Sequence, residues 1–312
     1  MKILLANPRG FCAGVRMAID TVDQVLRVQG APVYVYHAIV HNKHVVEDFI
    51  DRGAIFVEDV AKVPEGETVV FSAHGIPPKV RQEAESRNLK IHDATCPLVT
   101  KVHHEVVRYA RDGFHIIFIG HRDHQEAIGT VGEAPDHITV VETPEEAAEL
   151  EFGEDVKLVY ATQTTLSVTD AYRVINVLRE KFPGIREPAK EDICYATTNR
   201  QEAVGAWSAE ADLVLVVGSR NSSNSNRLVD RARELGTAAY LIDDQSEINP
   251  AWLEGVETVM LTAGASAPES YVQGVIDRLR EEYGATVEER SLAEEDVQFA
   301  LPRTVRKLTV VG

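Results

Sequence analysis

The three cysteines of this 312-residue chain are the residues whose types and spacing most directly predict chemistry. Cys12, Cys96 and Cys194 stand at similar intervals, and each opens a segment with a helical pattern, in GFCAGVRMAID, DATCPLVTKVHHEV and DICYATTNRQEAV. A thiolate at the N-terminus of a helix is stabilised by the helix dipole and is ready to bind a metal. Three structural repeats that each bring one thiolate to a common centre would make a three-cysteine metal site.

Three interpretations of these cysteines are open: buried thiols, a zinc site and an iron–sulfur cluster. Buried thiols that act as small hydrophobic residues would not have to stand at equivalent helix starts, as these three are expected to do. A zinc site of three cysteines and one histidine is chemically allowed, but structural zinc sites usually contain close cysteine pairs, which this sequence lacks. The pattern therefore favours a [4Fe–4S] cluster with three cysteine ligands, whose remaining iron can act as a Lewis acid toward a substrate oxygen.

Short apolar runs rich in β-branched residues alternate with helical patterns, which is typical of parallel strands buried on both faces. They include PVYVYHAIV, ETVVFSAHG, FHIIFIGHR, VKLVYATQ, DLVLVVGSR and ETVMLTAGA. We predict an α/β fold of three repeated units, each with a small, mostly parallel sheet. The expected units are 1–97, 98–191 and 192–281, and Pro188–Asp192 is expected to be a linker. The remainder, 282–312, is expected to pack on another unit as an extra strand or flap that includes the terminal LTVV.

Polar residues gather just after the expected strands, where open α/β sheets bind ligands. The run Ser222–Asn226 precedes a helix, and Ser266 follows the next strand, close to Gly264. The alternative to a solvated loop with a helix cap is a site where hydroxyls, amides and backbone N–H groups converge on an anion. The sequence matches neither the Walker phosphate loop nor the dinucleotide fingerprint, so nucleotide binding is not predicted.

Three histidines, His41, His74 and His124, each follow an expected strand. A single histidine in such a place is more often a cap or a core residue than a ligand-binding group. Three in equivalent positions favour contacts with a phosphate group, because protonated histidines offer both positive charge and directional donors.

Glu126, two residues beyond His124, has two interpretations. It is either a glutamate favoured by the helix dipole in the first turn or a general acid. The neighbouring hydroxyls of QTTLS, Thr164 and Thr165, are candidates for a relay that supplies its proton.

The composition limits the classes of partner. A net charge of −17 argues against general binding of nucleic acid, which needs clustered lysine and arginine. No apolar run approaches the roughly 20 residues that span a bilayer, so no membrane insertion is predicted. An odd number of cysteines without close pairs argues against a disulfide framework and fits a reducing cytoplasm.

The chain resembles the LytB/IspH family over nearly its whole length. The resemblance rests on NPRGFCAGVRMAI, FSAHGIP, DATCPLV, GHRDHQEAIGT, TQTTLSV, DICYATTNRQEAV, VGSRNSSNSNRL and TAGASAP, in this order. It implies a trefoil of three units related by pseudo-threefold symmetry around an oxygen-sensitive [4Fe–4S] cluster, one per subunit. Cys12, Cys96 and Cys194 match the cluster ligands of the family.

The implied reaction is reductive dehydroxylation of an allylic diphosphate, (E)-4-hydroxy-3-methylbut-2-enyl diphosphate, with two electrons and two protons. Isopentenyl and dimethylallyl diphosphate would be its products, in the last step of the methylerythritol phosphate route to isoprenoids. Glu126 matches the proton donor, and Thr164 matches the hydroxyl that orients the substrate and the relay. The positions expected to bind substrate are His41, His74, His124, Thr164, Thr165, Ser222, Ser223, Asn224 and Ser266.

The resemblance also implies a small electron-donor protein, such as a flavodoxin or ferredoxin, and a monomer or weak homodimer. The sequence itself contains no flavin or nicotinamide motif. Two other functions stay open: a zinc-dependent hydrolase of a phosphorylated metabolite, and a non-catalytic iron–sulfur sensor that binds a diphosphate. The sequence contains no DNA-reading module, which makes the sensor less favoured.

Overall fold

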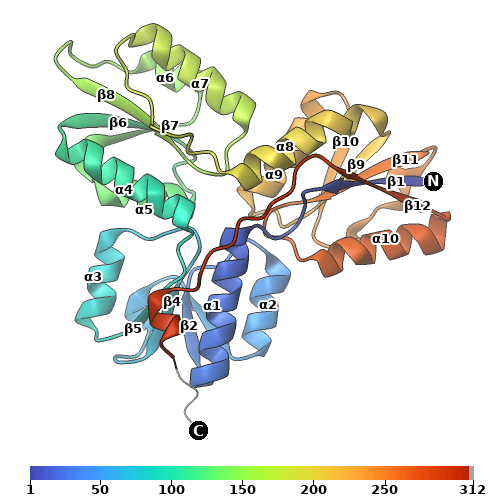
Figure 1. Cartoon of the computed structure of the whole chain (residues 1–312), viewed down its shortest axis with the longest axis horizontal. Coiled ribbons are helices and arrows are strands. Elements are labelled where there is room, and N and C mark those ends of the chain that lie inside the picture. The colour runs from blue at the N-terminus through green and yellow to red at the C-terminus, as the bar shows by residue number, and fades with distance from the viewer. Residues whose placement is uncertain (309–312) are drawn as a thin grey trace. The chain divides into compact units, whose positions relative to one another are not determined.

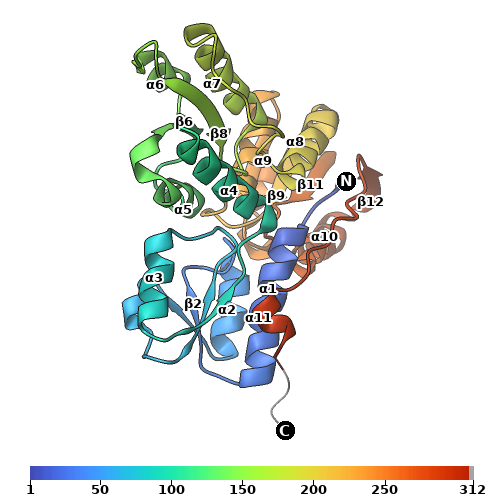
Figure 2. The same cartoon turned by 60° about the vertical axis from the view of Figure 1, so that its left-hand side comes forward.

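The structure, a computed structural model, describes residues 1–308 and divides into two compact units (Figure 1, Figure 2). Unit 1 contains Met1–Val15, His41–Val45 and Tyr195–Gln298, and unit 2 contains Arg16–Val40, Val46–Cys194 and the chain from Phe299 onward. Within the described residues the strands form three parallel sheets flanked by helices, which confirms the predicted α/β class with small parallel sheets. The boundaries predicted for three units stay a prediction.

Unit 1 is built on a single sheet with strand order β10-β9-β11-β1-β12. The N-terminal strand β1 pairs in parallel with β11 on one side and with β12 on the other, so the beginning of the chain joins elements from its end. The strands are β1 (Lys2–Asn7), β9 (Leu213–Val217), β10 (Ala238–Ile242), β11 (Thr258–Ala263) and β12 (Thr286–Ser291).

Both faces of this sheet are buried, which explains why its inner strands are continuous apolar runs. Leu4 and Ala6 of β1 pack with α8 and α9, whereas Ile3 and Leu5 pack with α10 on the opposite face. Figure 1 shows the helices on the two sides of the sheet. The helices are α8 (Tyr195–Trp207), α9 (Ser223–Glu234) and α10 (Glu269–Tyr283).

Unit 2 contains two sheets, with strand orders β3-β2-β4-β5 and β7-β6-β8, and every pairing in them is parallel. The first sheet has α3 on one face, with α1 and α2 on the other (Figure 1, Figure 2). The strands are β2 (Val33–Tyr36), β3 (Ala54–Val57), β4 (Thr68–Phe71), β5 (Lys90–Asp93), β6 (Phe114–Ile119), β7 (Ile138–Val141) and β8 (Lys157–Thr162).

The second sheet of unit 2 is also covered on both faces. Ile116 and Phe118 of β6 pack with α4 and α5, and the alternate residues Ile117 and Ile119 pack with α6 and α7. The helices associated with the two sheets are α1 (Ala13–Gln29), α2 (Lys43–Asp51), α3 (Pro78–Ser86), α4 (Pro97–Arg111), α5 (Gln125–Glu133), α6 (Pro144–Glu149) and α7 (Val168–Lys181).

The C-terminal segment contributes to both units. Its strand β12 extends the sheet of unit 1, and the short helix α11 (Arg303–Arg306) contacts β5 in unit 2, where Thr304 Oγ1 lies 3.0 Å from His92 Nδ1. Most of the terminal LTVV, which the sequence analysis assigned to a strand or flap, lies outside the described residues.

Candidate active site

The three cysteines occupy the same local structure. Each stands at the start of a helix, and its backbone N–H donates a hydrogen bond to the carbonyl of the second residue after the end of a strand. This repeat supports the sequence interpretation that the cysteines are equivalent. The three bonds run from Cys12 N to Ala265 O at 3.1 Å, from Cys96 N to Ala73 O at 3.0 Å, and from Cys194 N to Thr164 O at 3.0 Å.

The chemistry of these thiols suits an iron–sulfur cluster. All three are half-buried, and in unit 1 the backbone N–H of Val15 points at Cys12 Sγ, 3.5 Å away. A donor from the first helical turn favours the thiolate, which is the form that binds iron. Cys12 belongs to unit 1, whereas Cys96 and Cys194 belong to unit 2. Among residues 1–308, no three histidine, cysteine, aspartate or glutamate side chains are already gathered as a metal-holding group.

Glu126 lies in the first turn of α5, and its carboxyl group is bound by a single residue of unit 2. The backbone N–H of Thr164 donates to Glu126 Oε1 at 2.6 Å, and the Thr164 hydroxyl donates to Oε2 at 3.1 Å. Glu126 is only 2% exposed, and Thr164 is 4% exposed. The structure thus brings together the two residues predicted to handle a proton.

Burial controls the acidity of this carboxyl group. The pKa of Glu126 is raised to about 7, mainly by desolvation and in addition by the nearby Asp192, although both hydrogen bonds from Thr164 act to lower it. A carboxylic acid with a pKa near neutrality can hold and release a proton at the working pH, which is what a general acid requires.

Two of the predicted histidines, His74 and His124, lie together in unit 2, and His124 contacts the backbone of Glu126. His124 is the N-cap of α5, and its Nδ1 accepts a hydrogen bond from the backbone N–H of Glu126 at 3.1 Å. The rings of His74 and His124 meet edge to face, with centroids 5.9 Å apart. His124 therefore caps the helix, the more common role considered for it, and also stands within reach of His74. Thr165 lies nearby in sequence, and its hydroxyl accepts from Gln163 Nε2 at 3.0 Å.

In unit 1 the polar residues of two strand ends form one buried cluster. Ser222 is the N-cap of α9, and its hydroxyl oxygen lies 3.5 Å from that of Ser266. The Ser266 hydroxyl donates to the backbone carbonyl of His41 at 2.9 Å, and Asn224 Oδ1 accepts from Ala265 N at 2.8 Å. These groups surround the N-terminus of α9, where backbone N–H groups and the dipole favour an anion. Half-buried Ser223 is the first residue of that helix.

Glycine makes this close approach possible. A Cβ atom at Gly264 would lie 2.0 Å from Ser225 Oγ, and one at Gly218 would lie 2.2 Å from the same atom. Ser225 is completely buried, so it has no room to retreat. A side chain at either glycine would therefore displace the helix start that carries Ser222 and Asn224.

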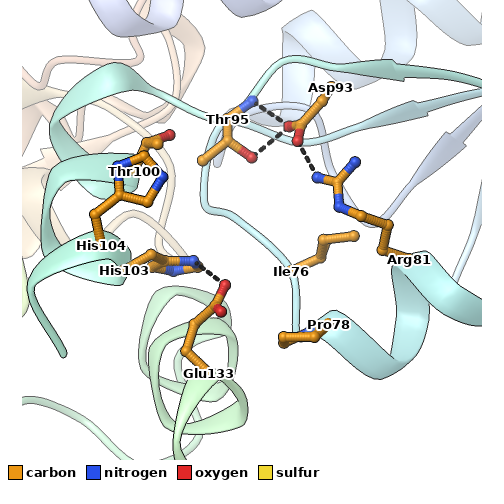
Figure 3. A pocket seen from close by; sticks show the side chains of 9 residues that line it. All are labelled: Ile76, Pro78, Arg81, Asp93, Thr95, Thr100, His103, His104 and Glu133. Atoms are coloured by element: carbon orange, nitrogen blue, oxygen red, sulfur yellow. Dashed lines mark hydrogen bonds and ion pairs between the residues drawn. The ribbon is translucent and has the colours of Figure 1, made fainter. Parts of the chain in front are cut away.

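A pocket of about 360 Å³ in unit 2 is lined in part by Thr95, the residue before Cys96 (Figure 3). Arg81 pairs with Asp93 on one wall, and His103 pairs with Glu133 on another, with 2.9 Å between Nδ1 and Oε1. Arg81 and Asp93 neutralise each other, so that wall carries little net charge, whereas the other wall presents the hydrogen-bonded pair His103 and Glu133. The residues that line it are Ile76, Pro78, Arg81, Asp93, Thr95, Thr100, His103, His104 and Glu133, which include none of the predicted site residues.

A buried ion pair in unit 1 was not foreseen from the sequence. Arg200 of α8 is completely buried and donates to Glu295 Oε1 at 2.9 Å and to the carbonyl oxygen of Gly10 at 2.8 Å. It thereby connects the loop before Cys12 to the segment after β12. An arginine within a helical pattern gives no signal of such a role, because most such arginines are solvated.

Comparison with known proteins identifies the family. The LytB protein family model matches residues 3–280. The chain belongs to the LytB family. A 4-hydroxy-3-methylbut-2-enyl diphosphate reductase of Rhodopirellula baltica is 54% identical over 98% of this chain and 96% of its own length.

Two solved structures extend the comparison with the LytB family. The E-1-hydroxy-2-methyl-but-2-enyl-4-diphosphate reductase of Plasmodium falciparum is 40% identical, with a TM-score of 0.96 over 98% of this chain and 96% of that one. A second structure, of (E)-4-hydroxy-3-methyl-but-2-enyl diphosphate reductase, the terminal enzyme of the non-mevalonate pathway, is 32% identical, with a TM-score of 0.63 over 90% of this chain and all of that one. No helix within the described part of the chain has the length and apolar character to cross a membrane.

Proposed function

We propose that this protein reduces (E)-4-hydroxy-3-methylbut-2-enyl diphosphate to isopentenyl and dimethylallyl diphosphate, as the last enzyme of the non-mevalonate route. The observation that carries the proposal is a fully buried carboxylic acid, Glu126, held by Thr164 and protonated near neutral pH, in a chain of the LytB family. Two electrons and two protons convert the allylic alcohol into the alkene and one molecule of water.

We assign Cys12, Cys96 and Cys194 as the ligands of a [4Fe–4S] cluster, one per subunit. Their soft thiol donors and their helix-start positions support this choice over zinc. When bound, the cluster would supply the two electrons and a Lewis-acidic iron that no cysteine ligates.

The proposed proton donor is Glu126. Its acid form gives a proton to the departing hydroxyl group, which leaves as water, and burial keeps that proton in place until the substrate arrives. Thr164 orients the carboxyl group through its backbone N–H, and its hydroxyl can pass on the second proton, which forms the new C–H bond. Addition of this proton at either end of the allylic unit gives the two products.

The diphosphate is proposed to bind the polar cluster of unit 1 and the histidines. Ser222, Ser223, Asn224 and Ser266 offer neutral donors at the start of α9, which suit an anion in a chain of net charge −17. His41, His74 and His124 would add directional donors, and Thr165 would contact the substrate beside Thr164.

The partners belong to the same proposal. An external electron donor, a flavodoxin or ferredoxin, would reduce the protein in the cytoplasm, because the sequence carries no flavin or nicotinamide motif. We propose a monomer or a weak homodimer as the working form.

The test is anaerobic turnover of protein reconstituted with iron and sulfide. Oxidation of a reduced viologen dye is followed on addition of 4-hydroxy-3-methylbut-2-enyl diphosphate, and the products are identified. Dye oxidation that depends on substrate, with both five-carbon diphosphates formed, is expected. Protein that carries a complete cluster without turnover would indicate a diphosphate sensor instead, and bound zinc in place of iron and sulfide would indicate a hydrolase.

A further inference from the structure

Asp192, two residues before Cys194, carries a fully buried carboxylate. Its side chain is 0% exposed, Oδ1 accepts a hydrogen bond from Lys101 Nζ at 2.7 Å, and Oδ2 accepts from the backbone N–H of Thr162 at 3.0 Å. The proline and charge content of Pro188–Asp192 predicted that this residue belongs to a linker. Its burial instead places it inside unit 2, between helix α4 and the end of strand β8.

Lys101 binds three successive residues of the same segment. Besides Asp192, its ammonium group donates to the carbonyl oxygen of Lys190 at 2.8 Å and to that of Glu191 at 3.2 Å. An ammonium group has three N–H donors, so each of them has an acceptor in this segment. A lysine bound in this way fixes the path of the backbone that leads to Cys194.

The bond between Lys101 and Asp192 joins two segments that each carry a proposed cluster ligand. Lys101 lies in the second turn of α4, the helix that begins directly after Cys96, and Asp192 lies two residues before Cys194. The same aspartate accepts a hydrogen bond from the backbone N–H of Thr162. Two residues further on, the carbonyl of Thr164 accepts from the N–H of Cys194, and the N–H of Thr164 donates to the carboxyl group of Glu126. All of these residues belong to unit 2.

We propose that Lys101 is a positioning residue, which fixes the segment of Cys194 relative to the helix of Cys96 and so prepares two ligands for the cluster. A buried ion pair is a poor source of stability, because an apolar pair of similar volume often stabilises a protein equally well. Its value lies in the fixed geometry, as with the outer groups that orient metal ligands. The inference rests on the proposed function, because it needs a cluster at these cysteines.

The experiment compares Lys101→Met, the double variant Lys101→Met with Asp192→Asn, and the control Lys190→Met, whose side chain is exposed. Each full-length protein is reconstituted anaerobically, and iron and sulfide content, the electron paramagnetic resonance of the reduced cluster and iron release to a chelator are measured. We expect Lys101→Met to release iron about 10- to 100-fold faster than the parent. The control should match the parent in every measurement.

The double variant separates positioning from stability. It removes both charges of the Lys101–Asp192 pair, so its thermal unfolding temperature without the cluster should lie above that of Lys101→Met. The carboxylate of Glu105, 3.5 Å from Lys101 Nζ, loses that lysine in both variants. The double variant still lacks the hydrogen bonds that Lys101 donates to the carbonyls of residues 190 and 191. Its iron release should therefore stay fast, and its electron paramagnetic resonance should stay altered. Recovery of cluster retention together with stability would overturn the proposal, as would parent-like iron release from Lys101→Met.

A further variant and the behaviour of the parent protein help to interpret the result. Lys101→Arg retains the charge in case the methionine variants fail to fold. Its planar guanidinium cannot direct donors to three successive acceptors in the same way, so altered resonance is again expected, and a resonance identical to that of the parent would contradict the proposal. Failure of the parent itself to assemble iron and sulfide would overturn the proposed function, which is distinguishable from failure of the positioning role alone.

Discussion

The two polar clusters described above occupy the same place in the α/β architecture and have opposite chemistry. In unit 1, Ser222, Asn224 and Ser266 gather neutral donors and acceptors where two strands end at the start of α9. In unit 2, the corresponding strand ends and the start of α5 hold an acid, Glu126. The strand ends therefore set the place of each candidate site, and the side chains found there determine its chemistry.

The difference follows from desolvation. A neutral hydroxyl or amide can be buried at modest cost once it is hydrogen-bonded, and it carries no charge that would repel an anion. A buried carboxyl group becomes a weaker acid, as Glu126 does, and so it is suited to carry a proton. In the proposed function, the hydroxyl and amide groups of unit 1 bind the diphosphate and Glu126 of unit 2 gives a proton. The following predictions test this proposed division in order of decreasing effect.

The largest effect is expected from Glu126→Gln. The glutamine oxygen can still accept from the backbone N–H of Thr164, and its NH₂ group can donate to the Thr164 hydroxyl. Glutamine has no acidic proton to give, so turnover should fall by about 100-fold or more. Cluster content and substrate affinity should stay close to those of the parent. The variant is assayed anaerobically for turnover, with iron analysis and a binding titration, and parent-like turnover would remove Glu126 from the role of proton donor.

The same substitution should make the folded protein more stable at high pH. The pKa of Glu126 is raised on folding from 4.5 to about 7, so the stability it contributes is fully present below pH 4.5 and is lost as the pH rises through 7. At pH 8 the burial of the charged carboxylate costs on the order of 3 kcal/mol, which glutamine avoids. Urea unfolding without the cluster should show a gain for Glu126→Gln at pH 8 that shrinks toward pH 4.5. A gain of equal size at both pH values would indicate a pKa that is not raised.

In unit 1, Asn224→Ala and Ser266→Ala should act on binding. Loss of a hydrogen bond to a charged ligand costs about 1.5 kcal/mol or more, so KM should rise by about 10-fold or more while the cluster signal is unchanged. Asn249→Ala, which removes an exposed asparagine cap in the same unit, is the matched control. If the substitutions lowered kcat alone, the division of roles between the two clusters would be wrong.

The smallest effect is expected in the pH profile of Thr164→Val, whose turnover at the optimum should also fall because the proposed relay hydroxyl is lost. This change removes the hydroxyl that donates to Glu126 Oε2 and keeps the backbone donor, so the pKa of Glu126 should rise. The fall in turnover on the alkaline side should then move to higher pH, by less than about one unit. The pH profile of turnover is the measurement, and Thr139→Val on β7 is the matched control. A shift to lower pH would contradict the assigned hydrogen bond.

Much of this arrangement could be predicted from local patterns. The apolar runs correctly indicated parallel strands buried on both faces, and each cysteine does stand at a helix start. The strands β3 and β7 were not singled out, although they have the same length of four residues as β2 and β4, which were. The pairing of β1 with β11 and β12 was also beyond the sequence, since periodicity shows that a strand is buried but not which strand lies beside it.

The rest of the site could not be predicted, because a sequence does not show which of its charged residues are buried. Asp192 stands in a segment rich in proline and charge, yet its carboxylate is fully buried because Lys101 accompanies it. The raised pKa of Glu126 likewise comes from residues distant in sequence that exclude water. A motif can identify such residues, but only the packed structure shows what makes them unusual.

The pairing of β1 between β11 and β12 has a consequence for how the chain is made. Both sheets of unit 2 are encoded by one stretch of about 130 residues, Val33–Thr162, and can pair soon after that stretch leaves the ribosome. Strand β1 must wait for β11, through about 250 intervening residues, or roughly 10 to 50 seconds of translation, and longer for β12. An apolar segment without neighbours for that time is a natural client for a chaperone, and slow translation would prolong its exposure more than that of any other strand.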